Sequence, residues 1–357
     1  MYKYLLLISI ILFSCQDEIT LELPKADDKL VIEGSIENGF PPYIIITKNG
    51  GYFDPIDNET FDNLFVNDIE SVEIWYNDND GVKLDSVILE QITFFDSLPP
   101  IYTDINFFNN NVDFETGELT SPYDFSKQGR TYYLEIKWNN QVISSSTTIP
   151  EVTPLDCLWV KKSENNDKEF KYDIRGLYSD PADQNNFILV KSKRIQHFEY
   201  KDSLECQVKD RPDNSLKLLD AGSDVLINGE SFETYFPRPR ESGNPFPSSS
   251  YNAYHTKLCD VSLIEGTLVV GDTLVFKEDI VLIKYCQIDE PSLKFWRGLI
   301  RQVGTNGNPF AEPLNLVSNI TNGLGIFTGY GSAYYMVPIV KDTVIFEQYS
   351  PKIIDIF

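Results

Sequence analysis

Residues Ile280–Pro338 read IVLIKYCQIDEPSLKFWRGLIRQVGTNGNPFAEPLNLVSNITNGLGIFTGYGSAYYMVP, and this stretch decides the fold. It starts with an apolar run typical of a buried strand, continues with the pattern of an amphipathic helix, and returns through a Gly- and Asn-rich segment into an aromatic strand. Almost nothing else in the chain has helical periodicity. We therefore expect this stretch to form the centre of a C-terminal β domain that carries one helix.

The helix is predicted at about residues 290–303. Asp289 is a suitable N-cap, Glu290 and Pro291 suit a first turn, and Gly304 supplies the stop. Apolar residues recur at helical spacing on one face, namely Leu293, Trp296, Leu299 or Ile300, and Val303. A tryptophan in the middle of such a face is usually part of a core. We therefore expect the helix to pack across the open end or flank of a β-sandwich.

Several motifs along the chain resemble those of one known family. The C-terminal pair is NPFAEP at 308–313 followed by SNITNGLGIF at 318–327, and earlier motifs are LVIEG at 30–34, DPADQNNF at 180–187 and GDTL at 271–274. Together they resemble the Domain of unknown function 4249 lipoproteins of Bacteroidota over most of the chain. That family has no settled biochemical activity, so the resemblance implies an envelope lipoprotein and little about chemistry.

The N-terminus resembles a lipoprotein signal peptide, predicted at residues 1–14. Lys3 gives a short positive region, and the apolar run Leu5–Phe13 is too short to span a membrane. The sequence Leu-Phe-Ser-Cys at 12–15 fits a lipobox, which predicts lipidated Cys15 as the mature N-terminus. Residues 15–29 are polar, contain Pro24 and are expected to be a tether.

Directly after the predicted lipidated cysteine come Gln16, Asp17 and Glu18. Acidic residues at this place resemble the surface-export signal of Bacteroidota lipoproteins. We therefore expect a lipid-anchored protein of the outer membrane that faces the cell exterior.

The composition narrows the classes of partner. The formal net charge is -24 at pH 7, which argues against nucleic acid as a partner because phosphates would be repelled. The hydrophobic content of 42% is ample for packed cores in about two domains. No segment after the signal is long and apolar enough for a transmembrane helix, so lipid is the expected anchor.

The N-terminal domain is predicted at residues 30–153 as an immunoglobulin-like or transthyretin-like β-sandwich. Short alternating runs separated by turns indicate strands at 30–36, 43–47, 71–76, 82–89, 131–138 and 141–149. Asn139 and Asn140 form a predicted two-residue hairpin turn, and Gly81 closes another. The stretch Asn77–Gly81 fails as a calcium loop at both of its ends and is predicted to be a polar hairpin tip.

The C-terminal domain, predicted at 154–349 and followed by a tail at 350–357, is expected to be a larger β-sandwich. The chain is thus predicted to be mainly β, with two sandwich domains. Strand-like runs lie at 168–177, 186–196, 261–270, 273–287, 334–339 and 343–346.

The segment from Asp202 to Lys257 has no clear periodicity and is predicted to be a surface loop. It is locally basic and aromatic in an acidic chain, with Phe236, Arg238, Arg240 and Phe246 as the candidate partner-binding residues. The alternative is a linker-like loop without a partner.

Four cysteines follow Cys15. Cys259 and Cys286 lie in strand-like runs on either side of the turn at 271–272 and are the first candidates for a disulfide, although buried free thiols are an alternative. With only two histidines, His197 and His255, a zinc site is not expected.

The chain lacks the short motifs of serine hydrolases, zinc proteases and nucleotide-binding folds, so we predict no enzymatic activity and no cofactor. The family resemblance favours a non-catalytic accessory lipoprotein beside a TonB-dependent outer-membrane channel in nutrient uptake. Two alternatives stay open. The first is an independent surface protein that binds or hydrolyses glycans or peptides, and the second is a factor in envelope assembly.

Overall fold

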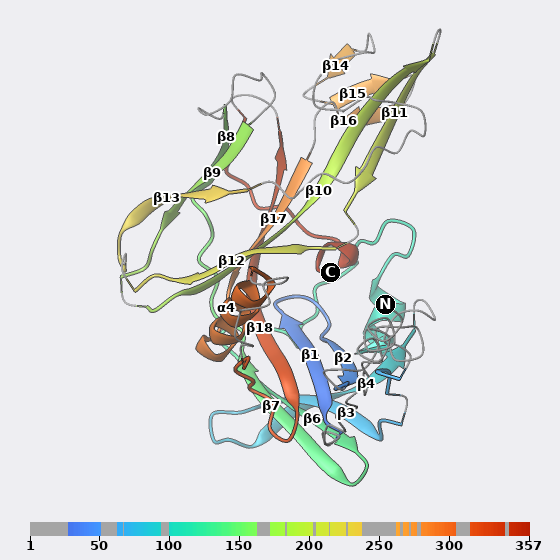
Figure 1. The fold of residues 1–357 in the computed structure, drawn as a ribbon, viewed down its shortest axis with the longest axis vertical. Coiled ribbons are helices and arrows are strands. Elements are labelled where there is room, and N and C mark those ends of the chain that lie inside the picture. Colours follow the sequence, from blue (N-terminus) through green and yellow to red (C-terminus); the bar gives the residue numbers. More distant parts are fainter. Residues whose placement is uncertain are drawn as a thin grey trace, which may run out of the picture.

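The computed structural model describes residues 28–50, 63–66, 68–93, 100–162, 172–182, 184–202, 205–213, 215–225, 228–237, 262–264, 267–270, 273–276, 280–304, 315–339 and 343–357. Within these ranges the protein is mainly β, as predicted, with two α-helices, α3 (Ile105–Asn111) and α4 (Glu290–Gly304) (Figure 1). Neither helix is long and apolar enough to cross a membrane.

The strands of the N-terminal part are β1 (Leu30–Glu37), β2 (Tyr43–Lys48), β3 (Ser71–Asn77), β4 (Lys83–Ile92), β5 (Ile101–Thr103), β6 (Thr131–Trp138) and β7 (Gln141–Thr148). Those of the C-terminal part are β8 (Cys157–Lys162), β9 (Tyr172–Ser179), β10 (Phe187–Asp202), β11 (Glu205–Pro212), β12 (Lys217–Ser223), β13 (Ser231–Phe236), β14 (Ser262–Ile264), β15 (Thr267–Val270), β16 (Thr273–Phe276), β17 (Ile280–Gln287), β18 (Leu324–Pro338) and β19 (Val344–Ile345).

Strand β18 joins the two parts of the chain into one sheet. Its first half pairs in parallel with β1, from Leu324 opposite Val31 to Tyr330 opposite Glu37, and its second half pairs antiparallel with β17. The sheet runs in the order β11-β10-β17-β18-β1-β2-β5-β4-β3-β6-β7, with β12 beside β10. The first strand of the chain therefore lies beside the last long one (Figure 1). The predicted division into domains at residue 153 stays a prediction, and this sheet runs across it.

The first hydrophobic core lies in the N-terminal part. It packs inward side chains of β1 and β2 against those of β3, β6 and β7, with Ile32, Ile44, Ile74, Leu134 and Ile143 all 1% exposed or less. Strand β4 pairs with both β5 and β3 and so links the two sides. Buried and more exposed residues alternate along β6 and most of β7, which is the period-2 pattern on which their prediction rested.

The second core lies between the four-stranded sheet β13-β9-β8-β19 and one face of β10, β17 and β18. Helix α4 packs on the same large sheet through a separate cluster in which Leu293 and Trp296 meet Leu189, Cys286 and Tyr330. Since β17 is buried along its whole length, it has apolar neighbours on both faces. The helix predicted at about 290–303 is confirmed as α4, and Trp296 is a core residue.

The N-cap of α4 also fastens the helix to the N-terminal part. Asp289 Oδ1 accepts a hydrogen bond from the Ser292 backbone N–H at 3.0 Å, and Oδ2 accepts one from the Thr147 hydroxyl at 2.7 Å. The Thr147 hydroxyl in turn accepts from the Gly329 backbone N–H at 2.7 Å. This chain of contacts connects helix α4, strand β7 and strand β18, so one predicted cap residue holds three elements.

The predicted turns have the expected backbone. Asn139 and Asn140 have φ of 49° and 57°, as a two-residue hairpin turn requires, and Gly81 has φ of 80°. Asp78 Oδ1 accepts from the backbone N–H groups of Asp80 and Val82, so the polar stretch after β3 is a hairpin tip.

The prediction of an irregular segment from Asp202 to Lys257 was wrong, because β11, β12 and β13 lie within it. Strand β11 was missed because its sequence is highly charged. It pairs antiparallel with the second half of β10, Ile195–Asp202. The prediction also missed the short elements β5, α3 and β8. Helix α3 has seven residues, too few for a helical period to stand out.

Glycines along β18 allow other backbone segments to cross it closely. A Cβ atom on Gly329 would lie 2.3 Å from the Thr148 carbonyl oxygen, far inside van der Waals contact. Gly325 has φ of +98°, which side chains rarely allow, and a Cβ there would lie 2.0 Å from the Ile32 carbonyl oxygen. Gly325 in the motif at 318–327 and Gly329 further along β18 are thus explained by close backbone packing.

We predict that Gly329→Ala destabilises the protein by at least about 3 kcal/mol, because neither backbone can move aside without breaking its sheet. Gly222→Ala is the matched control, since a Cβ at that strand position meets nothing within 4 Å. Urea unfolding followed by tryptophan fluorescence measures both. Equal stability of the two variants would show that the close crossing at Gly329 does not exist.

Candidate functional site: a cavity beside the C-terminal segment

A cavity of about 650 Å³ opens where segments from the beginning, the middle and the end of the chain meet. Its lining residues are Asn38, Gly39, Phe40, Glu118, Leu119, Pro122, Ser332, Tyr334, Gln348, Tyr349, Ser350, Pro351 and Lys352. We call this the junction cavity. The elements that bring these segments together are β1, the loop after α3, strand β18 and the C-terminal residues.

The first wall is the turn that follows β1. Gly39 has φ of 80°, and its N–H and C=O bond to Ser126 O and Tyr123 N at 3.0 and 2.8 Å. The Asn38 side-chain oxygen accepts from the Ser332 backbone N–H at 2.7 Å, which ties the turn to β18. The backbone N–H and C=O of Gly39 and the side-chain oxygen of Asn38 therefore all help to hold the shape of this turn.

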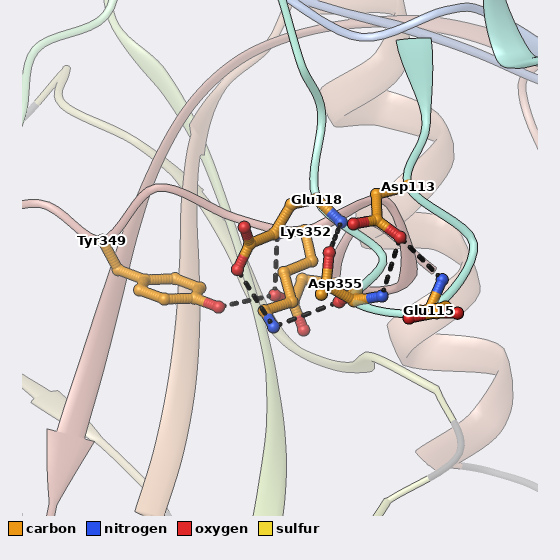
Figure 2. Close-up of polar contacts among 7 residues, drawn as sticks. Asp113, Glu115, Glu118, Tyr349, Lys352 and Asp355 are labelled. Carbon is orange, nitrogen blue, oxygen red and sulfur yellow. Dashed lines mark hydrogen bonds and ion pairs between the residues drawn. The ribbon is translucent and has the colours of Figure 1, made fainter. Parts of the chain in front are cut away.

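The second wall is the turn from Asp113 to Glu118. Asp113 Oδ1 accepts from the backbone N–H groups of Glu115 and Thr116 at 2.8 and 3.3 Å (Figure 2). These two bonds stabilise the ionised carboxylate and hold the pKa of Asp113 below its ordinary value. The Gly117 carbonyl oxygen then accepts from the Ile353 N–H at 2.8 Å, so the turn is stitched to the C-terminal residues.

The third wall is the C-terminal segment, which Asp355 organises. Asp355 Oδ2 accepts from the Lys352 backbone N–H at 2.9 Å and from the Tyr349 hydroxyl at 3.0 Å, and Oδ1 pairs with Lys193 Nζ at 3.0 Å. Burial, and then the charge of Asp355, raises the pKa of Tyr349. Lys352 reaches the Thr116 carbonyl and Glu118, and Figure 2 shows these side chains gathered around the C-terminal turn.

Beneath the cavity lies a buried ion pair. Tyr334 lines the cavity, and its hydroxyl donates to Glu37 Oε1 at 2.6 Å, while Glu37 Oε2 pairs with Lys284 Nζ at 2.5 Å. The side chains of Lys284 and Glu37 are 0% and 2% exposed. Burial lowers the pKa of Lys284, but the charge of Glu37, the neighbouring Cys286 and Tyr43, and the hydrogen bond to Glu37 together outweigh burial, so the pKa is raised. The pair joins β1 to β17 across β18.

The chemistry that this site can perform follows from which groups are already engaged. The ionisable side chains at its rim and floor, Glu118, Lys352, Tyr349 and Tyr334, each have a partner within the protein. Groups such as Gln348 and Ser350 stay exposed and can exchange hydrogen bonds with a ligand. Among the described residues no cluster of three or more metal-ligating side chains occurs. The arrangement suits hydrogen bonding to a bound molecule.

Most of the residues that the sequence singled out lie outside the described ranges. This applies to Cys15, Gln16, Asp17 and Glu18 at the N-terminus, and to Arg238, Arg240, Phe246 and Cys259 further on. Their predicted roles in lipidation, export and partner binding stay predictions.

Phe236 is not a surface residue, which corrects its assignment to a partner-binding loop. It ends strand β13 with 2% of its surface exposed and packs edge to face on Tyr285, with ring centroids 6.4 Å apart. Its neighbour Tyr235 is 50% exposed. The alternation of β13 turns Phe236 inward, and this strand was not recognised in the sequence.

Cys286 is a free and fully buried thiol, which agrees with the second alternative for the cysteines. The Ser332 hydroxyl donates to its sulfur at 3.3 Å, and burial raises the pKa of the thiol to about 11. Cys157 is also free. A buried thiol such as that of Cys286 acts as a small apolar side chain.

The sequence prediction missed the junction cavity because its walls come from four separate segments. The C-terminal residues 350–357 were predicted to be a tail, although their pattern IIDIF carried a signal. Ile353 and Ile356 are 8% and 3% exposed and pack with Phe40 and Leu282. A cluster of apolar residues after the last strand is therefore better interpreted as a docking segment.

Comparison with known proteins places the chain in a family. A family model described as "Domain of unknown function (DUF4249)" matches residues 16–335. The chain belongs to this family. No curated protein matches the DUF4249 chain.

Solved structures similar to the DUF4249 chain are bacterial alpha-2-macroglobulins. They include Salmonella alpha-2-macroglobulin reacted with methylamine (10% identity, 76% of this chain and 14% of that chain covered, TM-score 0.22) and the native E. coli protein (9%, 89% and 14%, 0.21). A third is trypsin-activated E. coli alpha-2-macroglobulin (11%, 77% and 16%, 0.20). The DUF4249 chain spans about a seventh of these proteins, and similarity at this level carries no functional argument.

We predict that Asp355→Asn in the DUF4249 chain costs about 2–4 kcal/mol, because it leaves buried Lys193 without its counter-ion and weakens the bond to Tyr349. Hydrogen exchange at residues 348–357 should rise, since these bonds hold the segment. Glu118→Gln is the control, because its ion pair with Lys352 is exposed and is worth at most about 1 kcal/mol. Equal effects of the two substitutions would contradict the role given to Asp355.

We further predict that Glu37→Gln costs about 3–5 kcal/mol, since it strands a buried ammonium at Lys284. The double variant Glu37→Gln with Lys284→Met should recover a large part of that loss. Denaturant unfolding of the two single variants and the double variant gives the coupling free energy. Additive losses would mean that the two side chains do not interact in the folded protein.

Proposed function

We propose that this chain is a surface-exposed outer-membrane lipoprotein that acts as a non-catalytic accessory or binding subunit of an outer-membrane complex. The partner we propose is a TonB-dependent channel in nutrient uptake. The lipobox ending at Cys15 and the acidic pair Asp17 and Glu18 support the anchoring and the surface address. The family match begins at residue 16, directly after the proposed lipidation site.

The junction cavity is the observation that carries the binding role. Its walls are tied to each other by the contacts of Lys352 with Glu118 and Thr116 and of Asn38 with Ser332, so the cavity is formed before any partner arrives. A preformed site loses little conformational entropy on binding. Because its ionisable groups are engaged within the protein, it offers hydrogen bonds and apolar contact instead of a poised acid or base, which suits a loop of a partner protein.

Independent glycan binding, the alternative function, would need an open aromatic surface. The outward pair Trp75 and Tyr133 stacks with ring centroids 5.6 Å apart and an interplanar angle of 19°. Lys83 Nζ lies over the Trp75 ring at 4.8 Å from its centroid. Since Trp75 already has a stacking partner and a cation on its ring, it gives this alternative little support.

The test is an affinity purification of the tagged full chain from gently solubilised outer membranes, with mass spectrometry of the proteins that accompany it. We expect a TonB-dependent channel in near-stoichiometric amount. Gln348→Trp, which fills the mouth of the junction cavity, should reduce its recovery at least tenfold, while Asn79→Trp at the distant hairpin tip should not.

Anchoring is tested separately by labelling cells with an alkyne fatty acid. We expect the label on the wild-type chain and none on Cys15→Ala. Recovery of the wild-type chain alone would refute the accessory role, and an unlabelled wild-type chain would refute the lipid anchor. If Gln348→Trp recovered as much of the channel as the wild-type chain does, the contact would not lie at the junction cavity.

A further inference from the structure

A second cavity, of about 310 Å³, lies between helix α4 and the large sheet. Its lining residues are Glu33, Lys191, Leu216, Leu218, Leu219, Trp296, Leu299, Ile300 and Val303. They come from β1, from β10, from β12 and the residues before it, and from α4, which lies across β12 and β18 in Figure 1. We call this the α4 cavity, and none of its residues belongs to the junction cavity.

Lys191 is the one cation that lines the α4 cavity. Its ammonium lies 4.5 Å from the centroid of the Trp296 ring and 5.2 Å from that of Tyr330. In the part of the chain that the structure describes, Lys191 Nζ has no hydrogen bond or ion pair. Lys284, which lies over the same Tyr330 ring at 4.8 Å, is by contrast paired with Glu37.

Lys191 is half-buried, and an ammonium with reduced access to water and no ion-pair partner is costly, a cost that two aromatic rings offset only in part. Burial, and then the charge of Lys284, lowers the pKa of Lys191 to about 8. The ammonium nevertheless remains the major form at neutral pH. The site thus keeps a positive charge that makes no ion pair with a described residue, so an anion can pair with it.

The remaining walls decide which anion fits. The side chains from α4 and β12 are apolar, and Val303 at the end of the helix is 63% exposed, which leaves the cavity open there. The only acidic lining residue is Glu33, which is exposed and would repel a second negative charge. The ligand should therefore be a monoanion with an apolar body.

The volume sets the length of that body. A cavity of about 310 Å³ equals roughly ten water volumes, at about 30 Å³ each. A carboxylate with a hydrocarbon chain of about seven carbons has ten non-hydrogen atoms. This size lies at the lower end of ligand cavities in proteins.

We propose that the α4 cavity binds a medium-chain carboxylate, with the carboxylate paired to Lys191 and the hydrocarbon chain between α4 and β12. Trp296 is then both a core residue and the aromatic floor of the site. This inference does not depend on the proposed outer-membrane function, because it concerns a different cavity and is tested on the purified protein.

The test is isothermal titration calorimetry of octanoate into the full chain carrying Cys15→Ala, which removes the proposed lipidation site. We expect binding with a Kd in the micromolar range. Octanol, which has the same tail without a charge, should bind at least tenfold more weakly, and so should octyl phosphate, which carries more negative charge. Absence of octanoate binding, or equal binding of octanol, would overturn the proposal.

Two lysine variants separate the contribution of the Lys191 charge to binding from that of the apolar cavity walls. Lys191→Met removes the ammonium and keeps the bulk of the side chain, so octanoate affinity should fall at least tenfold while octanol affinity stays unchanged. Lys294→Met on α4 is the matched control, because Lys294 is exposed and paired with Glu290, and this variant should bind octanoate like the parent chain. Unchanged octanoate affinity in Lys191→Met would contradict the assignment of Lys191 as the partner of the carboxylate.

A third variant tests the place of the tail. Val303→Glu puts a negative charge at the exposed rim, where the side chain has room in solvent, and should weaken octanoate more than octanol. If both ligands bind Val303→Glu like the parent chain, the tail does not lie along α4.

The dependence on pH provides an independent readout. The titratable groups that act on Lys191 are Lys284, Cys286, Glu33 and Glu37, whereas α4 and β12 contribute only apolar residues to the cavity. Because Lys191 loses its proton as the pH rises through about 8, octanoate affinity should hold at neutral pH and fall roughly tenfold by about pH 9. An affinity that is constant over this range would exclude Lys191 as the counter-ion.

Discussion

The hydrogen bonds of β18 are the constraint on which the rest of the structure depends. One continuous strand gives its first half to β1 and its second half to β17, so the N-terminal and C-terminal parts share a sheet instead of meeting only through side chains. The second core and the α4 cluster both include side chains of β18, and the junction cavity opens at its edge. A change in the register of this strand would displace the helix and the cavity together.

The half-buried Lys191 and the buried Lys284 on neighbouring strands illustrate how environment decides the role of one residue type. Lys191 and Lys284 face each other in the pairing of β10 with β17 and share the ring of Tyr330. Lys284 has Glu37 and Tyr334 as partners in a closed network, and such a network mainly secures the arrangement of the strands. Lys191 lies over two aromatic rings, makes no ion pair with a described residue, and lines a cavity. The first is explained by the fold alone, whereas the second is better explained by a ligand.

Much of the fold could be predicted from the sequence, and the residues show why. Strands with clean alternation, such as the run from Thr131 to Trp138, and the capped helix after Asp289 carry their signal locally. The turn at Asn139 and Asn140 follows from the backbone conformation that these residues tolerate. The cavities could not be predicted in this way, because they depend on pairs such as Asp355 with Lys193 that are far apart in sequence. Strand β13 was not recognised in the sequence, because prolines and arginines follow directly after Phe236. Its buried face is recognisable only from its pairing with β9.

The parallel pairing of β1 with β18 also has a consequence for how the protein folds. Val31 and Leu324 are neighbours in the sheet although roughly 290 residues separate them, and closing so long a loop is entropically slow. During synthesis β1 emerges first, yet its partner on this edge is among the last segments to appear. An incomplete chain would expose an unpaired apolar strand edge, which is prone to association with other chains. The pairing of β1 with β18 can therefore form only after the C-terminal part of the chain is available.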